Sequence, residues 1–225
     1  MSVNAIEGNI KRLRVELPPE VTLVAVSKFH PAEALRSAYD AGQRVFGESR
    51  AAEMVAKAKT LPGDIQWHFI GHLQTNKVRQ IVPYVALIHS IDSERLLKLV
   101  SDEAVRAGRV VDVLLQAHVA QEEAKTGFMP DELMDFAAGY DASRYPGVRI
   151  CGLMGMASNT DDEVRVMTDF ESLRSLYNRL QSTPVAEGQP FKVLSMGMSH
   201  DYQLALQCGA NMVRIGSMIF GEREY

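Results

Sequence analysis

One lysine and two glycine–serine segments are the residues of this chain whose types and positions could do chemistry. Lys28 ends the apolar run 21–27 (VTLVAVS), and an amine at such a place becomes a nucleophile for carbonyl groups once its pKa is lowered by burial. The segments 197–199 (GMS) and 216–217 (GS) each follow another apolar run. Glycine-opened loops with hydroxyl groups are typical of phosphate sites. Together these residues indicate a small ligand that carries both a carbonyl group and a phosphate.

A phosphorylated aldehyde satisfies both requirements, and two kinds are candidates. Pyridoxal 5′-phosphate is one, and the sugar phosphates of Schiff-base aldolases are the other. Arg214 lies near the end of the last apolar run and favours pyridoxal phosphate, because a guanidinium can face a pyridine nitrogen as a fixed cation and donor. Plainer readings stay open: Lys28 as a solvated strand end, Ser199 as a helix N-cap and Gly216 as a tight turn.

The elements that must position these residues repeat along the chain. Eight times, a short apolar or β-branched run is followed by a turn and a helix-like stretch. The predicted strands begin at Val21, Arg44, Gln66, Val85, Val110, Val148, Phe191 and Met212. The helical patterns occupy 31–42, 50–61, 75–82, 93–108, 131–140, 161–180 and 200–210. Continuous apolar strands that alternate with helices predict a parallel sheet.

Eight such units predict an α/β fold, a single (β/α)8 TIM barrel domain over residues 1–225, with 1–16 as a short additional N-terminal helix. A doubly wound sheet is the alternative, but no G-x-G-x-x-G motif follows the first strand. In a barrel the carboxyl ends of the strands meet at one face. Lys28, Arg214 and both glycine–serine segments are therefore expected at one mouth.

Histidines also occur at the predicted strand ends. His68 and His72 lie on a strand and its end rather than on a helix with an intervening glutamate, so we expect no metal site. Four others are expected to line the mouth, as ligand contacts or as ordinary polar residues: His30, His89, His118 and His200.

The composition narrows the function classes. The formal net charge is −4 and basic residues are dispersed among acidic ones, which argues against a nucleic-acid surface. No apolar run is as long as a membrane-spanning helix, and Glu7 and Glu16 interrupt the amphipathic N-terminus, unlike a transit peptide. Cys151 and Cys208 lie far apart in apolar surroundings, as in a reduced intracellular protein. We expect a cytoplasmic protein, a monomer that binds neither nucleic acid nor membrane.

Seven motifs are distributed along nearly the whole chain. In chain order they are VAVSK, FGES, HFIGHLQTNK, IHSID, GLMGM, LSMGMSHD and VRIGSMIFGER. In this order they resemble the pyridoxal phosphate homeostasis proteins, also called YggS or PROSC. The resemblance implies a barrel of the alanine racemase N-terminal type (PLP fold type III), with pyridoxal 5′-phosphate as a Schiff base on Lys28.

The same resemblance implies a set of cofactor contacts. It assigns the phosphate to Ser199, Gly216 and Ser217 and the pyridine ring to Arg214. Met198 and Ser49 are the remaining predicted contacts. The chain departs from the family pattern at several places. Ser49 replaces the usual asparagine of FGEN, Ala52 lies where a glutamine is usual, and Ala117–His118 replaces a Val–Asn pair. The helical segment before VAVSK is also shorter than usual.

From this resemblance we expect a carrier or buffer of the cofactor rather than an enzyme, with apo forms of cofactor-dependent enzymes as possible recipients and no catalytic residue. A racemase needs a base on each face of the substrate carbon, and the chain ends at GEREY without a second domain to supply one. An arginine at the pyridine nitrogen also weakens the electron sink. The alternative is a PLP-dependent amino-acid racemase or decarboxylase.

Overall fold

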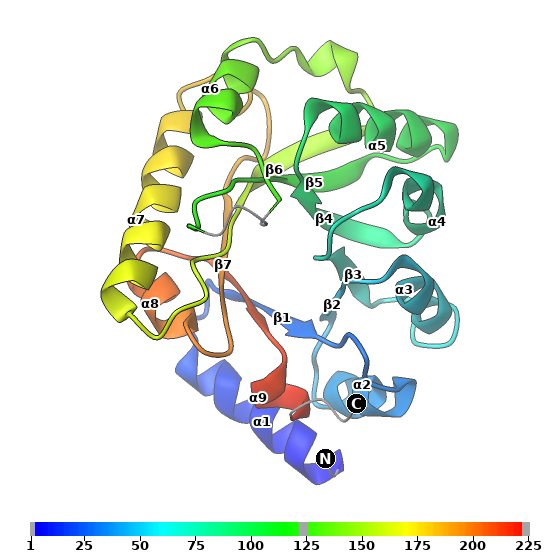
Figure 1. The fold of residues 1–225 in the computed structure, drawn as a ribbon. Coiled ribbons are helices and arrows are strands. Elements are labelled where there is room, and N and C mark those ends of the chain that lie inside the picture. The colour runs from blue at the N-terminus through cyan, green and yellow to red at the C-terminus, as the bar shows by residue number, and fades with distance from the viewer. Residues whose placement is uncertain (1–2, 122–125, 222–225) are drawn as a thin grey trace.

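Eight parallel strands form a closed barrel in the structure, a computed structural model that describes residues 3–121 and 126–221 (Figure 1). The strands are β1 (Thr22–Val26), β2 (Val45–Glu48), β3 (Gln66–Phe69), β4 (Val85–Ile91), β5 (Val111–Gln116), β6 (Val148–Met154), β7 (Val193–Met198) and β8 (Met212–Ile215). Pairing of Thr22 with Met212 and of Val24 with Arg214 joins β1 to β8 and closes the ring. The predicted (β/α)8 barrel is confirmed, and the doubly wound alternative is excluded.

Helices cover the outside of the barrel (Figure 1). They are α1 (Val3–Glu16), α2 (Ala32–Asp40), α3 (Ala51–Ala58), α4 (Val78–Ile81), α5 (Glu94–Arg106), α6 (Pro130–Ala138), α7 (Glu163–Leu180), α8 (Tyr202–Gln207) and α9 (Ser217–Phe220), with 3-10 turns η1 (Thr75–Lys77) and η2 (Ala142–Arg144). Each predicted helical pattern overlaps an observed helix, but α9 and η2 were not predicted because they are too short to show a period. In the part of the chain described, no helix combines the length and the apolar character that crossing a membrane requires.

Helix α7 illustrates how local sequence sets these elements. Asp162 caps its start by accepting hydrogen bonds from the backbone N–H groups of Val164 and Arg165. Its buried side chains recur every three or four residues, which places them on the face turned to the barrel. The apolar members of that face are Val166, Phe170, Leu173, Leu176, Tyr177 and Leu180.

The core has two layers. The larger lies between strands and helices, where α1 contributes Ile6, Ile10 and Leu13. The smaller fills the barrel interior with Val24, Leu87, Leu114, Cys151, Met154 and Met212. Toward the carboxyl ends of the strands the interior turns polar, because His89 follows Leu87 by two residues and Arg214 follows Met212 by two. The barrel is therefore packed at one end and carries buried polar groups at the other.

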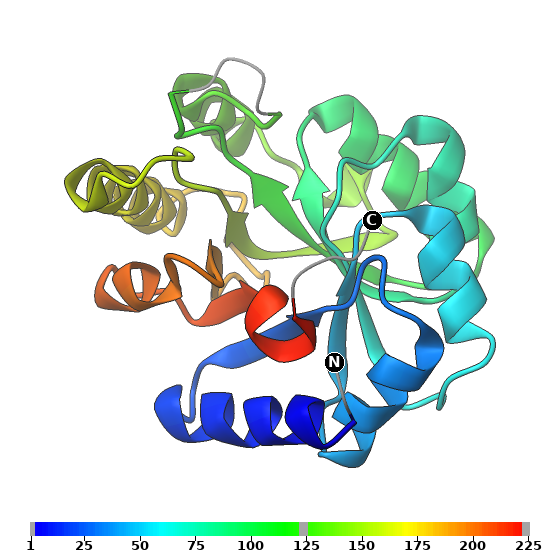
Figure 2. The ribbon, with the colours of Figure 1, turned by 60° about the horizontal axis from the view of Figure 1, so that its bottom comes forward.

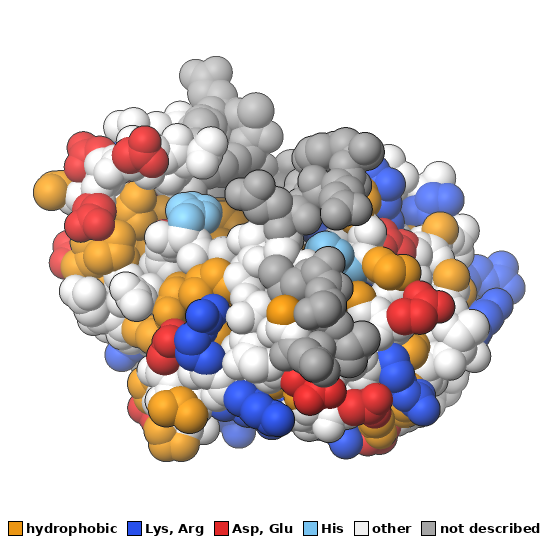
Figure 3. Space-filling view, turned by 90° about the horizontal axis from the view of Figure 1, so that it is seen from below, with side chains coloured by type: hydrophobic (Ala, Val, Ile, Leu, Met, Phe, Trp, Pro, Cys, Tyr) orange, Lys and Arg blue, Asp and Glu red, His pale blue; other side chains and the backbone are white. Residues whose placement is uncertain are grey.

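The N-terminal helix lies beside the last helix of the described chain (Figure 2). The Asn9 side-chain amide donates to the carbonyl oxygen of Ile219 at 3.1 Å, which ties α1 to α9. On the face seen in Figure 3, the described acidic and basic side chains are intermixed rather than gathered into a patch of one sign. Such mixed charge is typical of solvent-facing helices.

Candidate functional site at the mouth of the barrel

A cavity of about 550 Å³ opens at the carboxyl ends of the strands. Its lining comes from the ends of β1, β3, β6, β7 and β8: Val26, Lys28, His30, Ile70, Met156, Met198, Ser199, His200, Arg214, Gly216, Ser217 and Gly221. Six of the seven residues assigned to the cofactor thus share one cavity. Ser49 follows β2 and is not part of this lining, so its role stays a prediction.

Arg214 is the most deeply buried ionic residue of the lining, with 5% of the residue exposed. Its guanidinium donates from Nη1 to Ser195 Oγ at 2.8 Å and from Nη2 to the carbonyl oxygen of Gly155 at 3.1 Å. Burial lowers the pKa of Arg214 to about 10, and the charge of Asp201 acts in the opposite direction. The guanidinium is still a cation at neutral pH, and both of its bonded partners are uncharged.

Two histidines extend this hydrogen-bond network into the barrel. His89 Nδ1 lies 3.1 Å from Ser195 Oγ, and His89 Nε2 lies 3.0 Å from His68 Nδ1. Arg214 can only donate, so the Ser195 hydroxyl accepts from it, and we assign the hydroxyl's own proton to the bond with His89 Nδ1. His89 then carries its proton on Nε2 and donates to His68. Every bond of the chain therefore runs away from the mouth.

Both histidines of this network are neutral. Burial lowers the pKa of His68 to about 3. It also lowers the pKa of His89 well below its ordinary value, with the charges of His68 and Arg214 acting in the same direction. The expectation that His89 lines the mouth is wrong: it is fully buried behind Arg214. His118 also lies outside the lining, whereas His30 and His200 belong to it.

The two glycine–serine segments meet across the mouth. Ser199 Oγ accepts a hydrogen bond from the backbone N–H of Gly216 at 3.2 Å, so the hydroxyl proton is left for another acceptor. The N-cap reading of Ser199 is wrong, because α8 begins at Tyr202 and has Asp201 as its N-cap. Gly216 lies against β1, since a Cβ there would come within 3.2 Å of the Val26 carbonyl oxygen. The loops approach closely because this position has no side chain.

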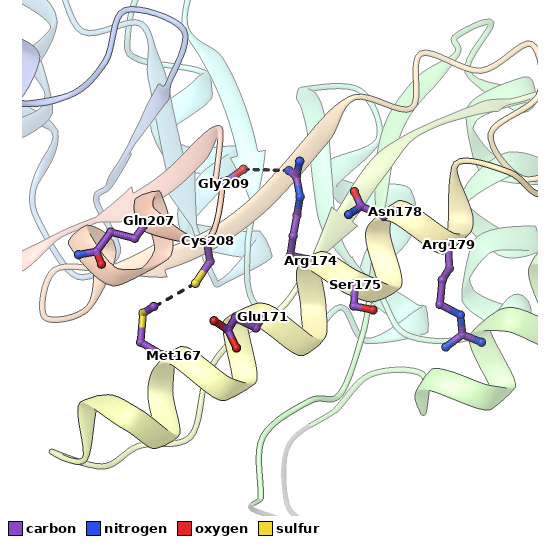
Figure 4. A pocket seen from close by; sticks show the side chains of 9 residues that line it. All are labelled: Met167, Glu171, Arg174, Ser175, Asn178, Arg179, Gln207, Cys208 and Gly209. Atoms are coloured by element: carbon purple, nitrogen blue, oxygen red, sulfur yellow. Dashed lines mark hydrogen bonds between the residues drawn. The ribbon is translucent and has the colours of Figure 1, made fainter.

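A larger groove, of about 740 Å³, lies on the outside of the barrel between α7 and the end of α8 (Figure 4). In Figure 4 the Arg174 side chain reaches the Gly209 carbonyl oxygen at 3.4 Å, and the Cys208 sulfur faces the Met167 sulfur at 3.8 Å. Burial raises the pKa of the Cys208 thiol, which makes it a poorer nucleophile. The groove therefore lacks the chemistry of the mouth despite its size.

The sequence prediction missed Ser195 as the partner of Arg214 and the pairing of His89 with His68. The available signal was a polar side chain two residues after an apolar one near the end of a strand, as His89 follows Leu87 in β4. Residues two apart on a strand point to the same face. Such alternation says that a polar group points into the barrel. It does not say which group on another strand it will meet.

Comparisons with known proteins identify the relatives of this chain. The family model for the alanine racemase N-terminal domain matches residues 1–224. A pyridoxal phosphate homeostasis protein of Schizosaccharomyces pombe is 40% identical over 206 residues, which cover 90% of this chain and 84% of that protein.

Solved structures extend the likeness to the fold. PipY of Synechococcus elongatus, solved with PLP bound, has a TM-score of 0.86 and 38% identity over 96% of this chain and 100% of that one. An alanine racemase of Streptomyces coelicolor shares the fold, with a TM-score of 0.73 and 20% identity over 98% of this chain and 59% of that one. Because likeness of sequence and of fold both extend over nearly the whole length, the chain belongs to the pyridoxal phosphate homeostasis protein family, within the wider alanine racemase N-terminal domain family.

Proposed function

We propose that this protein binds pyridoxal 5′-phosphate reversibly and acts as its carrier and buffer. The observation that carries the proposal is the set of groups around one cavity: a primary amine, a fixed guanidinium and two serine hydroxyls, from Lys28, Arg214, Ser199 and Ser217. The PLP-bound structure of the related PipY supports the same ligand.

The donor set fits the chemistry of this cofactor. When bound, pyridoxal phosphate supplies an aldehyde that condenses with a primary amine with loss of one water. Lys28 is the lysine of the cavity and would be the attachment point. Ser199, Gly216 and Ser217 would hold the phosphate, and the cation of Arg214 would face the ring. Met198 would pack against the cofactor, and Ser49 remains a proposed contact from outside the described lining.

Binding without efficient turnover is the second half of the proposal. A guanidinium that donates toward the pyridine nitrogen would keep this nitrogen unprotonated, which weakens the withdrawal of electrons on which carbanion chemistry depends. The described lining of the cavity contains no tyrosine or carboxylate, so a second base would have to be His30 or His200. The competing function is a racemase or decarboxylase, which the fold of the alanine racemases favours.

The remaining features of the proposal concern the setting. We propose a single cofactor-binding domain over residues 1–225, a monomeric and cytoplasmic protein, and delivery of the cofactor to apo-enzymes. A transfer assay separates delivery from buffering: an apo-enzyme should be activated faster by the loaded protein than by cofactor released into solution. Equal rates would leave buffering alone.

The attachment to Lys28 can be tested directly by loading the purified protein with pyridoxal phosphate. We expect a visible absorption band and, after borohydride reduction, the cofactor mass on the peptide that contains Lys28. Lys28→Ala should lose both signals, whereas Lys98→Ala should keep them, because Lys98 lies on the exposed face of α5. A wild-type protein without the band, or label on another lysine, would refute the proposed site. Exchange of an amino-acid α-proton in deuterated buffer at enzymatic rates would favour the racemase instead.

A further inference from the structure

The turn that carries Lys28 has an uncommon backbone conformation. The backbone N–H of His30 donates to the carbonyl oxygen of Ser27 at 3.1 Å, which closes a four-residue turn with Lys28 and Phe29 at its centre. Phe29 has a φ of 69° and is the one non-glycine residue with positive φ in the described chain. Third positions of such turns favour glycine or asparagine, because a Cβ is crowded there. Other contacts must therefore hold Phe29 in this conformation.

A buried cluster of one lysine and two glutamates lies against this turn. Lys57 Nζ, on α3, donates to Glu48 Oε1 at 2.7 Å, to Glu53 Oε1 at 2.7 Å and to the carbonyl oxygen of Ser27 at 2.8 Å. These three bonds use all three N–H donors of the ammonium. The Lys57 side chain is 8% exposed and that of Glu48 is fully buried. One ammonium thus links β2, α3 and the first residue of the turn.

The glutamates of this cluster bind the turn on both sides of Lys28. Glu53 Oε1 accepts the backbone N–H of Phe29 at 2.7 Å, and Glu48 Oε1 accepts the hydroxyl of Ser27 at 2.6 Å. The guanidinium of Arg50, just before α3, also lies over the Phe29 ring at 4.5 Å. The residues before and after Lys28 are therefore tied to this cluster and to α3, while Lys28 itself lines the cavity.

We propose that Glu48, Lys57 and Glu53 are positioning residues that hold the Lys28 turn in its positive-φ conformation, so that the lysine amine faces the mouth of the barrel. This inference rests on the proposed function, because it takes Lys28 as the attachment point. Relaxation of Phe29 to an ordinary negative φ would redirect the chain at Lys28 and turn the amine from the cavity. The cluster thereby sets cofactor affinity without touching the cofactor.

Glu53 is the best place to test the clamp, because its side chain is 21% exposed and its replacement leaves the buried Lys57–Glu48 pair intact. Loss of a hydrogen bond to a charged acceptor predicts that Glu53→Ala binds pyridoxal phosphate about tenfold more weakly. In the cofactor-free protein, the Phe29 amide should exchange its hydrogen about tenfold faster for the same reason. Glu53→Gln keeps an oxygen acceptor for this amide and should restore most of both properties.

A second substitution separates the clamp from general damage to the fold. Glycine adopts positive φ freely, so Phe29→Gly in the Glu53→Ala background should recover most of the lost affinity. Asp102→Ala, which removes an exposed partner of Lys98 on α5, is the matched control and should change neither the affinity nor the exchange rate.

Each outcome decides the inference. Unchanged affinity and unchanged Phe29 exchange in Glu53→Ala would overturn it, and so would a double variant that binds no better than Glu53→Ala. A wild-type protein that takes up no pyridoxal phosphate would instead overturn the proposed function. In that case the Phe29 exchange rate and the rate of Lys28 acylation, measured peptide by peptide, would still support or overturn the clamp.

Discussion

Two buried polar networks lie next to the mouth, one inside the barrel and one between the barrel and α3. They differ in the charge of the groups that bind their cations. Inside, Arg214 bonds to a serine hydroxyl and a backbone carbonyl, and among the described residues it forms no ion pair. Outside, Lys57 bonds to two carboxylates. The inner cation thus donates hydrogen bonds to uncharged groups, with the charge of Asp201 acting on it without a direct ion pair, whereas the outer cation is bonded directly to carboxylates.

The difference teaches what each network is suited to do. A buried cation whose hydrogen-bond partners are uncharged can still attract a ligand of opposite charge. Its N–H donors are fixed in direction by the rigid strands around it. The outer cluster is not optimised for stability, because burial raises the pKa of Glu48 in spite of the attraction of Lys57. Glu48 Oε2 is also buried without a hydrogen-bond partner. A buried ion pair of this kind is weak evidence for stability, because desolvation of its charges offsets their attraction.

The largest effect should come from breaking the outer network at its centre. Lys57→Met leaves Glu48 buried without its cation, and removal of one partner of a buried ion pair typically destabilises a protein by about 3–5 kcal/mol. Urea unfolding should show this loss, whereas Lys98→Met, at an exposed pair, should change stability by about 0.5 kcal/mol or less. Similar small losses in both variants would mean that the outer network is no tighter than a surface ion pair.

The inner network should respond to acid. His68 has a folded pKa of about 3 against an ordinary value of 6.5, so the unfolded chain binds the proton first as pH falls. Above pH 6.5 His68 is neutral in both states and does not lower the free energy of unfolding. As pH falls from 6.5 toward 3, the unfolded chain is protonated and the free energy of unfolding decreases. The loss approaches about 1.4 kcal/mol per pH unit for this histidine, and His89 adds to it in the same direction.

This acid response is measured best by urea unfolding between pH 5 and 6.5, where most carboxylates keep their charge. His68→Gln retains an acceptor for the His89 N–H and should reduce the slope of stability against pH, by about half a proton at pH 6.5 and by close to one proton at pH 5. An identical slope in wild type and variant would show that His68 binds its proton as readily in the folded protein as in the unfolded chain, which would contradict the lowered pKa.

The smallest effect should come from shortening the inner chain of hydrogen bonds. Ser195→Ala leaves one Arg214 donor and His89 Nδ1 without their shared hydroxyl, which should destabilise the fold by about 1–3 kcal/mol. The absorption band of bound pyridoxal phosphate should also shift, because Arg214 loses one of its two anchors. Ser175→Ala, at an exposed position of α7, should alter neither property. A band unchanged in Ser195→Ala would place Arg214 outside contact with the cofactor ring.

The barrel could be predicted because each of its signals is local. The strand predicted to begin at Val85 is observed as β4 (Val85–Ile91), since its first four residues form the continuous apolar sequence that is typical of a strand buried on both faces. Alternation with helices then implied a parallel sheet, and the strand-end rule placed Lys28 and Arg214 at one mouth. The cavity lined by both residues agrees with that placement.

How deeply a side chain lies inside the barrel could not be predicted from the local sequence. His89 and Arg214 both lie near strand ends in sequence, yet His89 is fully buried and Arg214 reaches the cavity. Strand length does not reveal the stagger between neighbouring strands, which closure of the barrel imposes. The pairing of Val24 with Arg214 is one consequence of that stagger.

The sequence by itself therefore determined the elements, their parallel order and the set of strand ends that meet at the mouth, because hydrophobic period and turn residues act over a few neighbours. Only the tertiary structure decided that Lys57 and Glu53 of α3 form hydrogen bonds to the turn at Lys28, more than twenty residues earlier. That contact depends on how a helix packs across two strands. Such packing is set by the shapes of all the side chains between them rather than by any short stretch of the chain.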